Sequence, residues 1–480
     1  MSSVKGASGR MSPERSSWVP QIGNRDKPVY LAIADAIADD VRAGRLVPGQ
    51  RLPPQRQLAE RMGIDFTTVS RAYVEARHRG LVDARVGQGT FVRAPSATDR
   101  GGEGRSLAAA TRVIDMTMNQ PPLPASPVLL GRLREGMAAV VKRLEPRDML
   151  HYPGVGDAQE DRAAGTAWLA ARLPNVPVER LLVTPGTQGA LLALLTALTR
   201  PGDTVCAEAL TYPGFKAIAG QLGLRVVGVP MDGEGLDPVA LRHALARHRP
   251  KALYCIPTFH NPTTATLPLE RRHAVVAAAQ EHGVPIIEDD VYGPLPANPP
   301  PPLAALAPEG VYHIAGLAKC LSPMLRIAYV VSPDARQTLR VAAAQRGTTL
   351  MASPLSAAIA RRWIEDGTAG AVLDAIRAEA MARRALAESI LPVDRIDTKP
   401  EAFHLWLRLP ESWSRGEFTA HLRMRGIAAV GSDAFATTPD TPDALRICLG
   451  AAADREATRQ VLGIVADALD QLPSSAGVII

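Results

Sequence analysis

Hydrophobic and polar positions change their periodicity along the chain and divide it into four parts. From Pro28 onward, apolar residues recur at helical spacing, and two short apolar stretches then follow around a glycine-rich turn. After about residue 115, short apolar runs alternate with helical stretches, which is typical of β-α-β units and a largely parallel sheet. We therefore expect a disordered tail over residues 1–25, a small domain over 26–93, a flexible linker over 94–114 and an α/β domain over 115–480.

The small domain is predicted to contain three helices and a two-stranded wing. The spacing predicts helices over about 28–44 and 54–62 and a third from Phe66 onward, with Asp65 placed to cap it. Two short strands would flank the Gly87-Gln88-Gly89 turn. Helix, glycine turn, helix and hairpin describe a winged helix-turn-helix. The positions expected to face its core include Leu58, Val69, Tyr73 and Val74.

Positive charge is concentrated in this N-terminal part. Residues 1–93 hold 15 Lys and Arg against 9 Asp and Glu, and their net charge of +6 equals that of the whole chain. The remaining residues are therefore balanced. A positive excess over a helix-turn-helix is typical of a nucleic-acid-binding module, although a solvated basic tail would give the same count.

The second helix of such a pair enters the major groove of DNA. Arg56 can hold a phosphate or a base, and Gly87 lets the wing approach the DNA backbone closely. Residues 48–92 resemble the DNA-binding domain of the GntR family, which implies a double-stranded operator as partner. Many relatives have Ser-Arg where Asp65-Phe66 stand here, so the operator of a relative cannot be assigned to this chain. The remaining candidate DNA contacts are Thr67, Thr68, Ser70 and Arg71.

Composition indicates a folded protein with a large core. Hydrophobic residues make up 46% of the 480 residues and charged residues 21%. We find neither a run of about 18 apolar residues, as a membrane span needs, nor a secretory signal. The cysteines have no paired spacing, which indicates reduced thiols in a cytoplasmic protein. They are Cys206, Cys255, Cys320 and Cys448.

A single lysine, Lys319, stands in a polar turn between two apolar runs. A lysine in an apolar pocket has a lowered pKa, so its neutral amine can attack an aldehyde. Arg326 adds a permanent charge suited to a phosphate. An aldehyde and a phosphate on one small molecule describe pyridoxal 5′-phosphate (PLP). Taken alone, the stretch fits a solvated lysine better, because a lysine in a turn usually faces water.

Four further motifs follow apolar strands, where the carboxyl ends of parallel strands gather binding groups. A Gly-Thr-Gln turn opens a helix whose free N–H groups suit a phosphate. A tyrosine in a Tyr-Pro-Gly turn offers a flat face to a pyridine ring, and an Asn-Pro turn aims an amide. A carboxylate at a buried strand end is costly unless it meets a cation, such as a protonated pyridine nitrogen. The residues are Thr187, Gln188, Tyr212, Asn261, Asp289 and Tyr292.

The order of these motifs resembles that of fold-type I aminotransferases over most of residues 115–480. The resemblance implies that Lys319 binds PLP covalently, that Asp289 pairs with the pyridine nitrogen and that Tyr212 stacks on the ring. It also implies hydrogen bonds to the 3′-oxygen and to the phosphate. Asn261 and Tyr292 would bind the 3′-oxygen. The phosphate would be held by Thr187, Gln188 and Arg326.

The resemblance extends to three outlying positions. Tyr152 matches a tyrosine that reaches the phosphate of the partner subunit, which implies a homodimer with composite sites. Arg446 matches the arginine that grips the substrate carboxylate, and Asn119 lies where the family lines the substrate pocket. Many relatives carry serine at the positions of Gly316 and Ala318, so we expect the phosphate to be held more loosely here.

A GntR-type winged helix joined to an aminotransferase-like domain resembles the MocR/GabR family of bacterial transcription regulators. The resemblance implies a head-to-tail dimer that senses an amino acid, an amine or a B6 vitamer through PLP. We expect an amino compound to displace Lys319 from PLP, with its carboxylate on Arg446, and the winged helices to shift on the operator. Two alternatives remain open: a working aminotransferase with an appended DNA-binding domain, and a DNA-binding protein whose large domain only dimerises.

Overall fold

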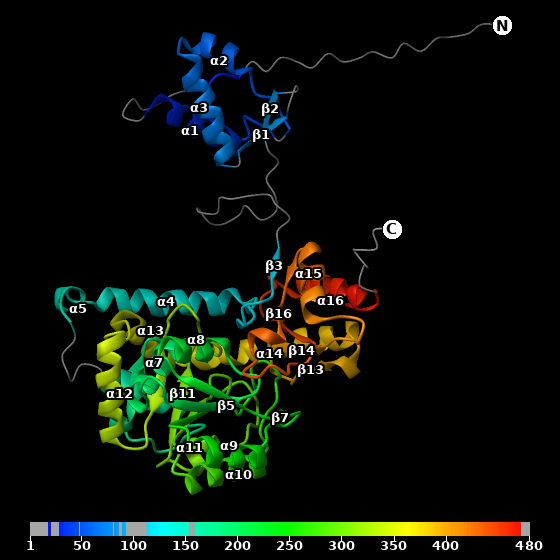
Figure 1. Ribbon diagram of the computed structural model, residues 1–480. Coiled ribbons are helices and arrows are strands. Elements are labelled where there is room, and N and C mark those ends of the chain that lie inside the picture. The colour runs from blue at the N-terminus through cyan, green and yellow to red at the C-terminus, as the bar shows by residue number, and fades with distance from the viewer. Residues whose placement is uncertain are drawn as a thin grey trace. The chain divides into compact units, whose positions relative to one another are not determined.

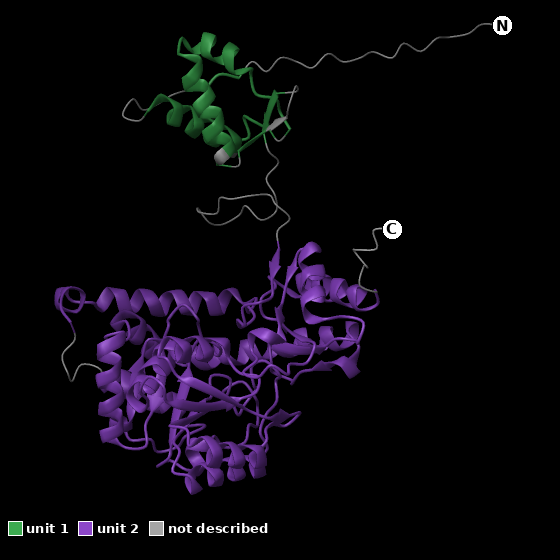
Figure 2. Cartoon of the chain, in the orientation of Figure 1, with its two compact units in different colours: residues 1–110 green, residues 111–480 purple. Residues whose placement is uncertain are grey.

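The chain folds into two compact units in the computed structural model (Figure 1). The structure describes residues 18–20, 28–47, 49–79, 81–85, 89–92, 113–152 and 159–471. Figure 2 shows the units, which comprise residues 1–110 and 111–480. Within the described ranges, no helix is long and apolar enough to cross a membrane.

The first unit is a winged helix-turn-helix. Asp65 caps the third helix, as expected, because its carboxylate accepts the backbone N–H of Thr67 at 2.7 Å. The two wing strands pair antiparallel, and the wing turn with Gly87 lies outside the described residues. Trp18, within the range expected to be disordered, donates its indole N–H to Asp40 at 2.6 Å. The elements are α1 (Val29–Arg42), α2 (Gln55–Met62), α3 (Phe66–His78), β1 (Val82–Arg85) and β2 (Gly89–Val92).

One of the positions predicted to face the core of this unit is wrong. Leu58, Val69 and Tyr73 are buried, as expected, and the Tyr73 hydroxyl donates to the Pro53 carbonyl at 2.8 Å. Val74, however, is 52% exposed. Val69 and Tyr73 are four residues apart and share one face of the helix, whereas Val74 lies about 100° further round.

The second unit is built on a seven-stranded sheet. Neighbouring strands pair parallel except β12, which is antiparallel to both of its neighbours. Because both faces of the sheet are covered by helices, its strands are largely apolar. The order across the sheet is β4 (Leu181–Thr184), β12 (Ala328–Val331), β11 (Val311–Gly316), β10 (Ile286–Asp289), β9 (Ala252–Cys255), β5 (Thr204–Glu208) and β6 (Arg225–Val229).

Helices cover this sheet: α7 lies against β4, β11 and β12, and α9 lies against β5 and β6. The strands β7 (Met231–Asp232) and β8 (Gly235–Leu236) form a two-stranded antiparallel sheet of their own. The helices are α4 (Pro127–Arg143), α5 (Pro146–Leu150), α6 (Gln159–Leu169), α7 (Gly186–Leu198), α8 (Pro213–Gln221), α9 (Pro238–His248), α10 (Leu269–Glu281), α11 (Leu303–Leu306), α12 (Ala335–Thr348), α13 (Pro354–Glu365) and α14 (Thr368–Ile390).

A smaller sheet forms the C-terminal lobe of the same unit. Its strand order is β13 (Ile396–Asp397), β14 (His404–Arg408), β17 (Ala444–Cys448) and β16 (Val430–Gly431). The helices α15 (Arg415–Met424) and α16 (Arg455–Leu469) belong to this lobe. Ile114, the last residue of the expected linker, pairs in β3 (Ile114–Asp115) with β15 (Ile427–Ala428).

Candidate functional site

The carboxyl ends of several strands meet at one edge of the large sheet. β10 ends at Asp289, β11 leads to Lys319, β9 leads to Asn261 and β4 leads to Thr187 at the start of α7. These four strands share one direction, so the loops that follow them open on the same side. The sheet therefore brings together residues that are far apart in the sequence.

Lys319 is largely buried in this region. Its Nζ donates to the backbone carbonyl of Asn119, and the Asn119 side-chain amide donates to the Tyr292 hydroxyl at 2.8 Å. Burial lowers the pKa of the Lys319 amine to about 8. A larger fraction of this amine is therefore neutral near pH 7 than for an exposed lysine, which makes it a better nucleophile.

Asp289 carries a buried carboxylate that uses only one of its oxygens in a hydrogen bond within the described residues. Its Oδ2 accepts the Tyr254 hydroxyl at 2.8 Å, while its Oδ1 has no hydrogen-bond partner among the described residues. Burial raises the pKa of Asp289 to about 6. A buried carboxylate oxygen without a partner is energetically costly. A protonated pyridine nitrogen would supply both a positive charge and an N–H donor.

The start of α7 forms a polar cradle beside these residues. The Arg326 guanidinium donates to Gln188 Oε1 at 3.3 Å, and the Gln188 amide donates to the Tyr212 hydroxyl at 3.4 Å. Gly186 has a φ of +74°, and a Cβ there would lie 3.4 Å from the Arg326 guanidinium. A cation beside free helix N–H groups suits a phosphate. Together with the spare Asp289 oxygen and the Lys319 amine, this donor set fits PLP.

Gly316 explains how the cradle differs from one with a serine at that position. A Cβ added at Gly316 would lie 2.5 Å from Thr187 Oγ1 and 2.9 Å from Val291 Cγ1. The Thr187 hydroxyl therefore occupies the space that a side chain at 316 would need. Ala318 offers no hydroxyl, so among these three positions Thr187 alone provides one.

We expect Gly316→Ala to lower the free energy of unfolding by about 1–3 kcal/mol, because the new methyl group overpacks against Thr187. Urea unfolding measures this change. Thr187→Ala in the same chain should recover part of the loss. Gly347→Ala is the control, since a Cβ there meets nothing within 4 Å; an equal loss in both variants would contradict the packing argument.

Arg446, on β17, is a buried cation of the site. It donates to Asn261 Oδ1 at 2.8 Å and to the Thr117 carbonyl, and its guanidinium lies 5.0 Å from the centre of the Phe435 ring. Its Nε has no partner in the described part of the chain. Burial lowers the pKa of Arg446, although an arginine stays charged. A buried cation with a free N–H can hold a carboxylate.

Two residues of the site were missed at the sequence level. Tyr254 is fully buried, stacks on Phe215 at 4.1 Å and orients Asp289. His404 pairs with Cys448 across the small sheet, and its ring lies 5.5 Å from that of Tyr292. Both lie in apolar strands, where the sequence offers only a weak signal: a polar atom in a run that is otherwise buried.

The structure leaves Tyr152 apart from the site residues of its own chain. It follows α5 and is 81% exposed.

In the first unit, Arg56, Thr67 and Arg71 are exposed, while Thr68 and Ser70 are partly buried. The Thr67 hydroxyl donates to Asp65, so its proton is already used. The Arg71 guanidinium lies 4.3 Å from the Tyr30 ring centre, on the side facing α1.

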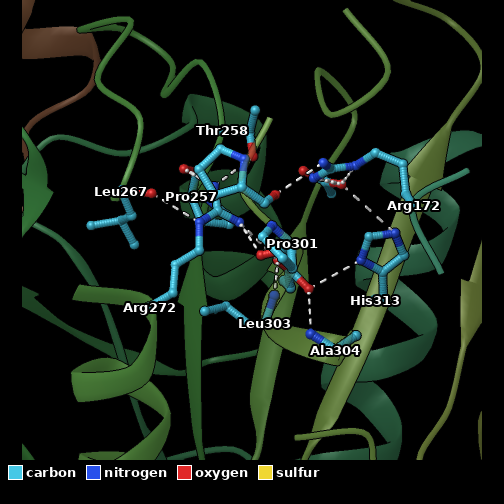
Figure 3. A network of polar contacts seen from close by, with 12 residues as sticks. Arg172, Pro257, Thr258, Leu267, Arg272, Pro301, Leu303, Ala304 and His313 are labelled. Atoms are coloured by element: carbon cyan, nitrogen blue, oxygen red, sulfur yellow. Dashed lines mark hydrogen bonds and ion pairs between the residues drawn. The ribbon is translucent and has the colours of Figure 1, made fainter. Parts of the chain in front are cut away.

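A buried ionic network joins Glu288 and Asp290, the neighbours of Asp289 in the sequence, through His313 (Figure 3). Glu288 accepts the backbone N–H groups of Leu303 at 2.7 Å and Ala304 at 2.9 Å, and His313 lies 3.1 Å from its Oε2. Arg172 donates to Asp290 Oδ2 at 2.7 Å. The residues on either side of Asp289 are therefore anchored, which holds the end of β10 in place.

Comparison with known proteins identifies both units. Residues 111–465 match the family of aminotransferase class I and II, and residues 29–92 match the bacterial regulatory proteins of the gntR family. The HTH-type transcriptional regulator YdeF of Bacillus subtilis is 30% identical over 95% of this chain and 97% of its own length. The pyridoxine biosynthesis regulator PdxR of Corynebacterium glutamicum is 28% identical over 66% of this chain and 68% of its own length.

A solved structure supports the fold of the second unit. The α-aminoadipate aminotransferase LysN from Thermus thermophilus aligns with a TM-score of 0.66 and 26% identity, covering 74% of this chain and 92% of that chain. The second unit is thus an aminotransferase class I and II domain of fold type I. With its N-terminal GntR domain, the chain belongs to the MocR-type family of HTH transcriptional regulators.

Proposed function

We propose that this regulator binds PLP at Lys319 and that an amino compound bearing a carboxylate acts through this site on the affinity for operator DNA. The observation that carries the proposal is the course of residues 113–120. This segment follows the linker from the DNA-binding unit, pairs as β3 with β15 and then contacts both Lys319 and Arg446. A change of partner at either side chain therefore acts on the segment that continues into the linker.

The contacts of this segment are direct. The Thr117 carbonyl accepts from Arg446 and the Asn119 carbonyl accepts from Lys319. A Cβ at Gly450 would lie 1.9 Å from a backbone oxygen of the segment, so the two backbones are in close contact. A tightly packed segment with two such hydrogen bonds transmits a rearrangement more readily than a loose one, since packed elements move between discrete positions.

The residues of the site would share the binding of PLP. When bound, PLP supplies an aldehyde that joins primary amines reversibly and a ring that stabilises negative charge. Asp289 would hold the ring nitrogen in its protonated form, and Tyr212 would cover one ring face. Asn261 and Tyr292 would bind the 3′-oxygen. The phosphate would be held by Thr187, Gln188 and Arg326, with Arg326 supplying the charge.

We also propose a head-to-tail homodimer. α4, α5 and Tyr152 expose large apolar side chains, which favours a protein partner over water. Tyr152 of a second copy would reach the phosphate, as the family resemblance implies. Sedimentation velocity should give the mass of a dimer, and a monomer that retains PLP would argue against this arrangement. The exposed fractions are 76% for Val128, 56% for Val141, 79% for Leu150 and 81% for Tyr152.

Arg446→Gln is expected to weaken binding of a carboxylate-bearing effector about 10- to 100-fold, because a charge-assisted hydrogen bond is lost. The measurement has two parts, both on full-length PLP-loaded protein. Absorbance titration with a panel of amino acids and amines finds the effector and its affinity. Mobility shift on the protein's own promoter, with and without that effector, then reports the change in DNA binding.

Arg408→Gln is the matched control, since Arg408 lies on the neighbouring strand β14 but pairs with Asp397 at the surface. It should keep the wild-type response. An effector that binds without changing DNA affinity would contradict the regulatory proposal. Sustained transamination above about 1 s⁻¹ would instead favour the aminotransferase alternative.

A further inference from the structure

The outward face of α3 carries two large apolar side chains that the core does not use. Phe66 is 42% exposed and Val74 is 52% exposed, whereas Val69 and Tyr73 on the inner face are buried. Phe66, Ser70 and Val74 are spaced four residues apart and so lie on one line along the helix. This line starts at Phe66, which is the first residue of α3.

Phe66 is held beside a cation. The guanidinium carbon of Arg56, on α2, lies 5.8 Å from the centre of the Phe66 ring, within the range of a cation-π attraction. Arg56 is itself exposed. Asp65, just before Phe66, is occupied in capping the helix through the backbone N–H and hydroxyl of Thr67. An apolar ring and a guanidinium therefore stand together at the N-terminus of the recognition helix.

This position is where a helix-turn-helix meets the edges of bases in the major groove. Thymine alone among the four DNA bases presents a methyl group there, and phenylalanine is among the side chains that make apolar contact with it. The net charge of +6 over residues 1–93 favours DNA as the partner that covers this face. A helix that contacted only phosphates would have no apolar partner for an exposed phenylalanine at this position.

We propose that Phe66 contacts the C5-methyl group of a thymine in the major groove and makes the operator depend on that methyl group. Arg56, against the ring, brings a positive charge to the same part of the groove. The inference rests on the proposed DNA binding and adds the base feature that this chain reads.

The test compares binding sites that differ by one methyl group. Full-length PLP-loaded protein first selects sites from a randomised duplex library, in parallel with Phe66→Ala, at one salt concentration. In the selected wild-type site, each thymine is then replaced in turn by deoxyuridine, which lacks only the methyl. For one thymine, wild-type affinity should fall about fourfold, as expected for one buried methyl group. Phe66→Ala should bind both duplexes equally.

Two further variants separate the possible causes. Phe66→Leu keeps an apolar side chain and should keep most of the preference for thymine over uracil. Val29→Ala removes an exposed apolar side chain from α1 and should keep all of it. If Phe66→Ala folds poorly, Phe66→Leu and Phe66→Gln provide the same apolar-to-polar comparison.

The outcomes are distinguishable. Failure to select any sequence would overturn the proposed DNA binding itself. A selected site at which every uracil substitution is neutral, or at which Phe66→Ala retains the wild-type preference, would overturn this inference alone. An unchanged preference with a loss of dimer mass in Phe66→Ala would assign the side chain to a contact between copies and would also overturn it.

Discussion

Replacing Lys319 with alanine is expected to abolish the covalent retention of PLP. Lys319 is the lysine placed at the site edge of the large sheet, where burial lowers its pKa to about 8. The variant should show no absorbance band of lysine-bound PLP. After borohydride reduction and peptide mass mapping, wild-type protein should carry the label on Lys319 and the variant should carry none.

Two other variants serve as controls for this result. Lys251→Ala removes an exposed lysine just before β9 and should retain the band and the label. Lys319→Arg keeps the positive charge but not the nucleophile, so it should lose the label as well. Label on another lysine in the wild-type protein, with Lys319 unmodified, would contradict the assignment.

The lowered pKa also sets a pH dependence for the attachment of PLP. The neutral amine is the reactive form, and its fraction increases as the pH rises through about 8. The rate of attachment should therefore rise between pH 6 and about 8 and level off above that value. A rate that keeps rising to about pH 10 would show an amine with the ordinary pKa of an exposed lysine.

Replacing Glu288 with alanine is expected to lower the free energy of unfolding by about 3–5 kcal/mol. Glu288 is fully buried and accepts hydrogen bonds from two backbone N–H groups, and His313 and Arg272 lie beside it. Removing the carboxylate leaves the two backbone N–H groups without this acceptor away from water, and Arg272 loses the nearby negative charge while it keeps its hydrogen bonds to backbone carbonyls. Denaturant unfolding measures the loss, and PLP absorbance should shift too, because the next residue is Asp289.

A surface ion pair provides the comparison for this variant. Glu281 pairs with Arg242 at 3.2 Å, and both side chains are about half exposed. Glu281→Ala should therefore cost less than about 1 kcal/mol. Equal losses in the two variants would show that burial does not set the cost.

The same network gives a stability difference that depends on pH. Burial alone would raise the pKa of Glu288, but the hydrogen bond from His313 and the nearby Arg272 outweigh it and hold the pKa below the ordinary 4.5. The stabilisation by the carboxylate is therefore full above pH 4.5 and is lost as the pH falls through the lower, folded-state pKa. The advantage of wild type over Glu288→Gln should shrink in that acidic range.

The sequence by itself determined the features that depend on neighbours along the chain. Helical spacing and the Asp65 cap placed the helix-turn-helix, and an apolar run on each side of a polar turn placed the strands around Lys319. The alternation of strands and helices predicted the α/β fold, which the family matches confirm. Local periodicity is readable because backbone hydrogen bonds and side-chain direction repeat every two or about 3.6 residues.

Only the tertiary structure decided which distant residues meet. The strand pairing brings Tyr254 to Asp289 and His404 to Tyr292, and no local pattern encodes such pairings. The ion pair of Arg172 with Asp290, just after β10, and the contacts of residues 113–120 likewise join segments more than 100 residues apart. The exposure of Val74 was decided in the same way, because packing against neighbouring helices selects which apolar positions are covered. Burial depends on how the elements pack together, so it cannot be read from a local sequence pattern.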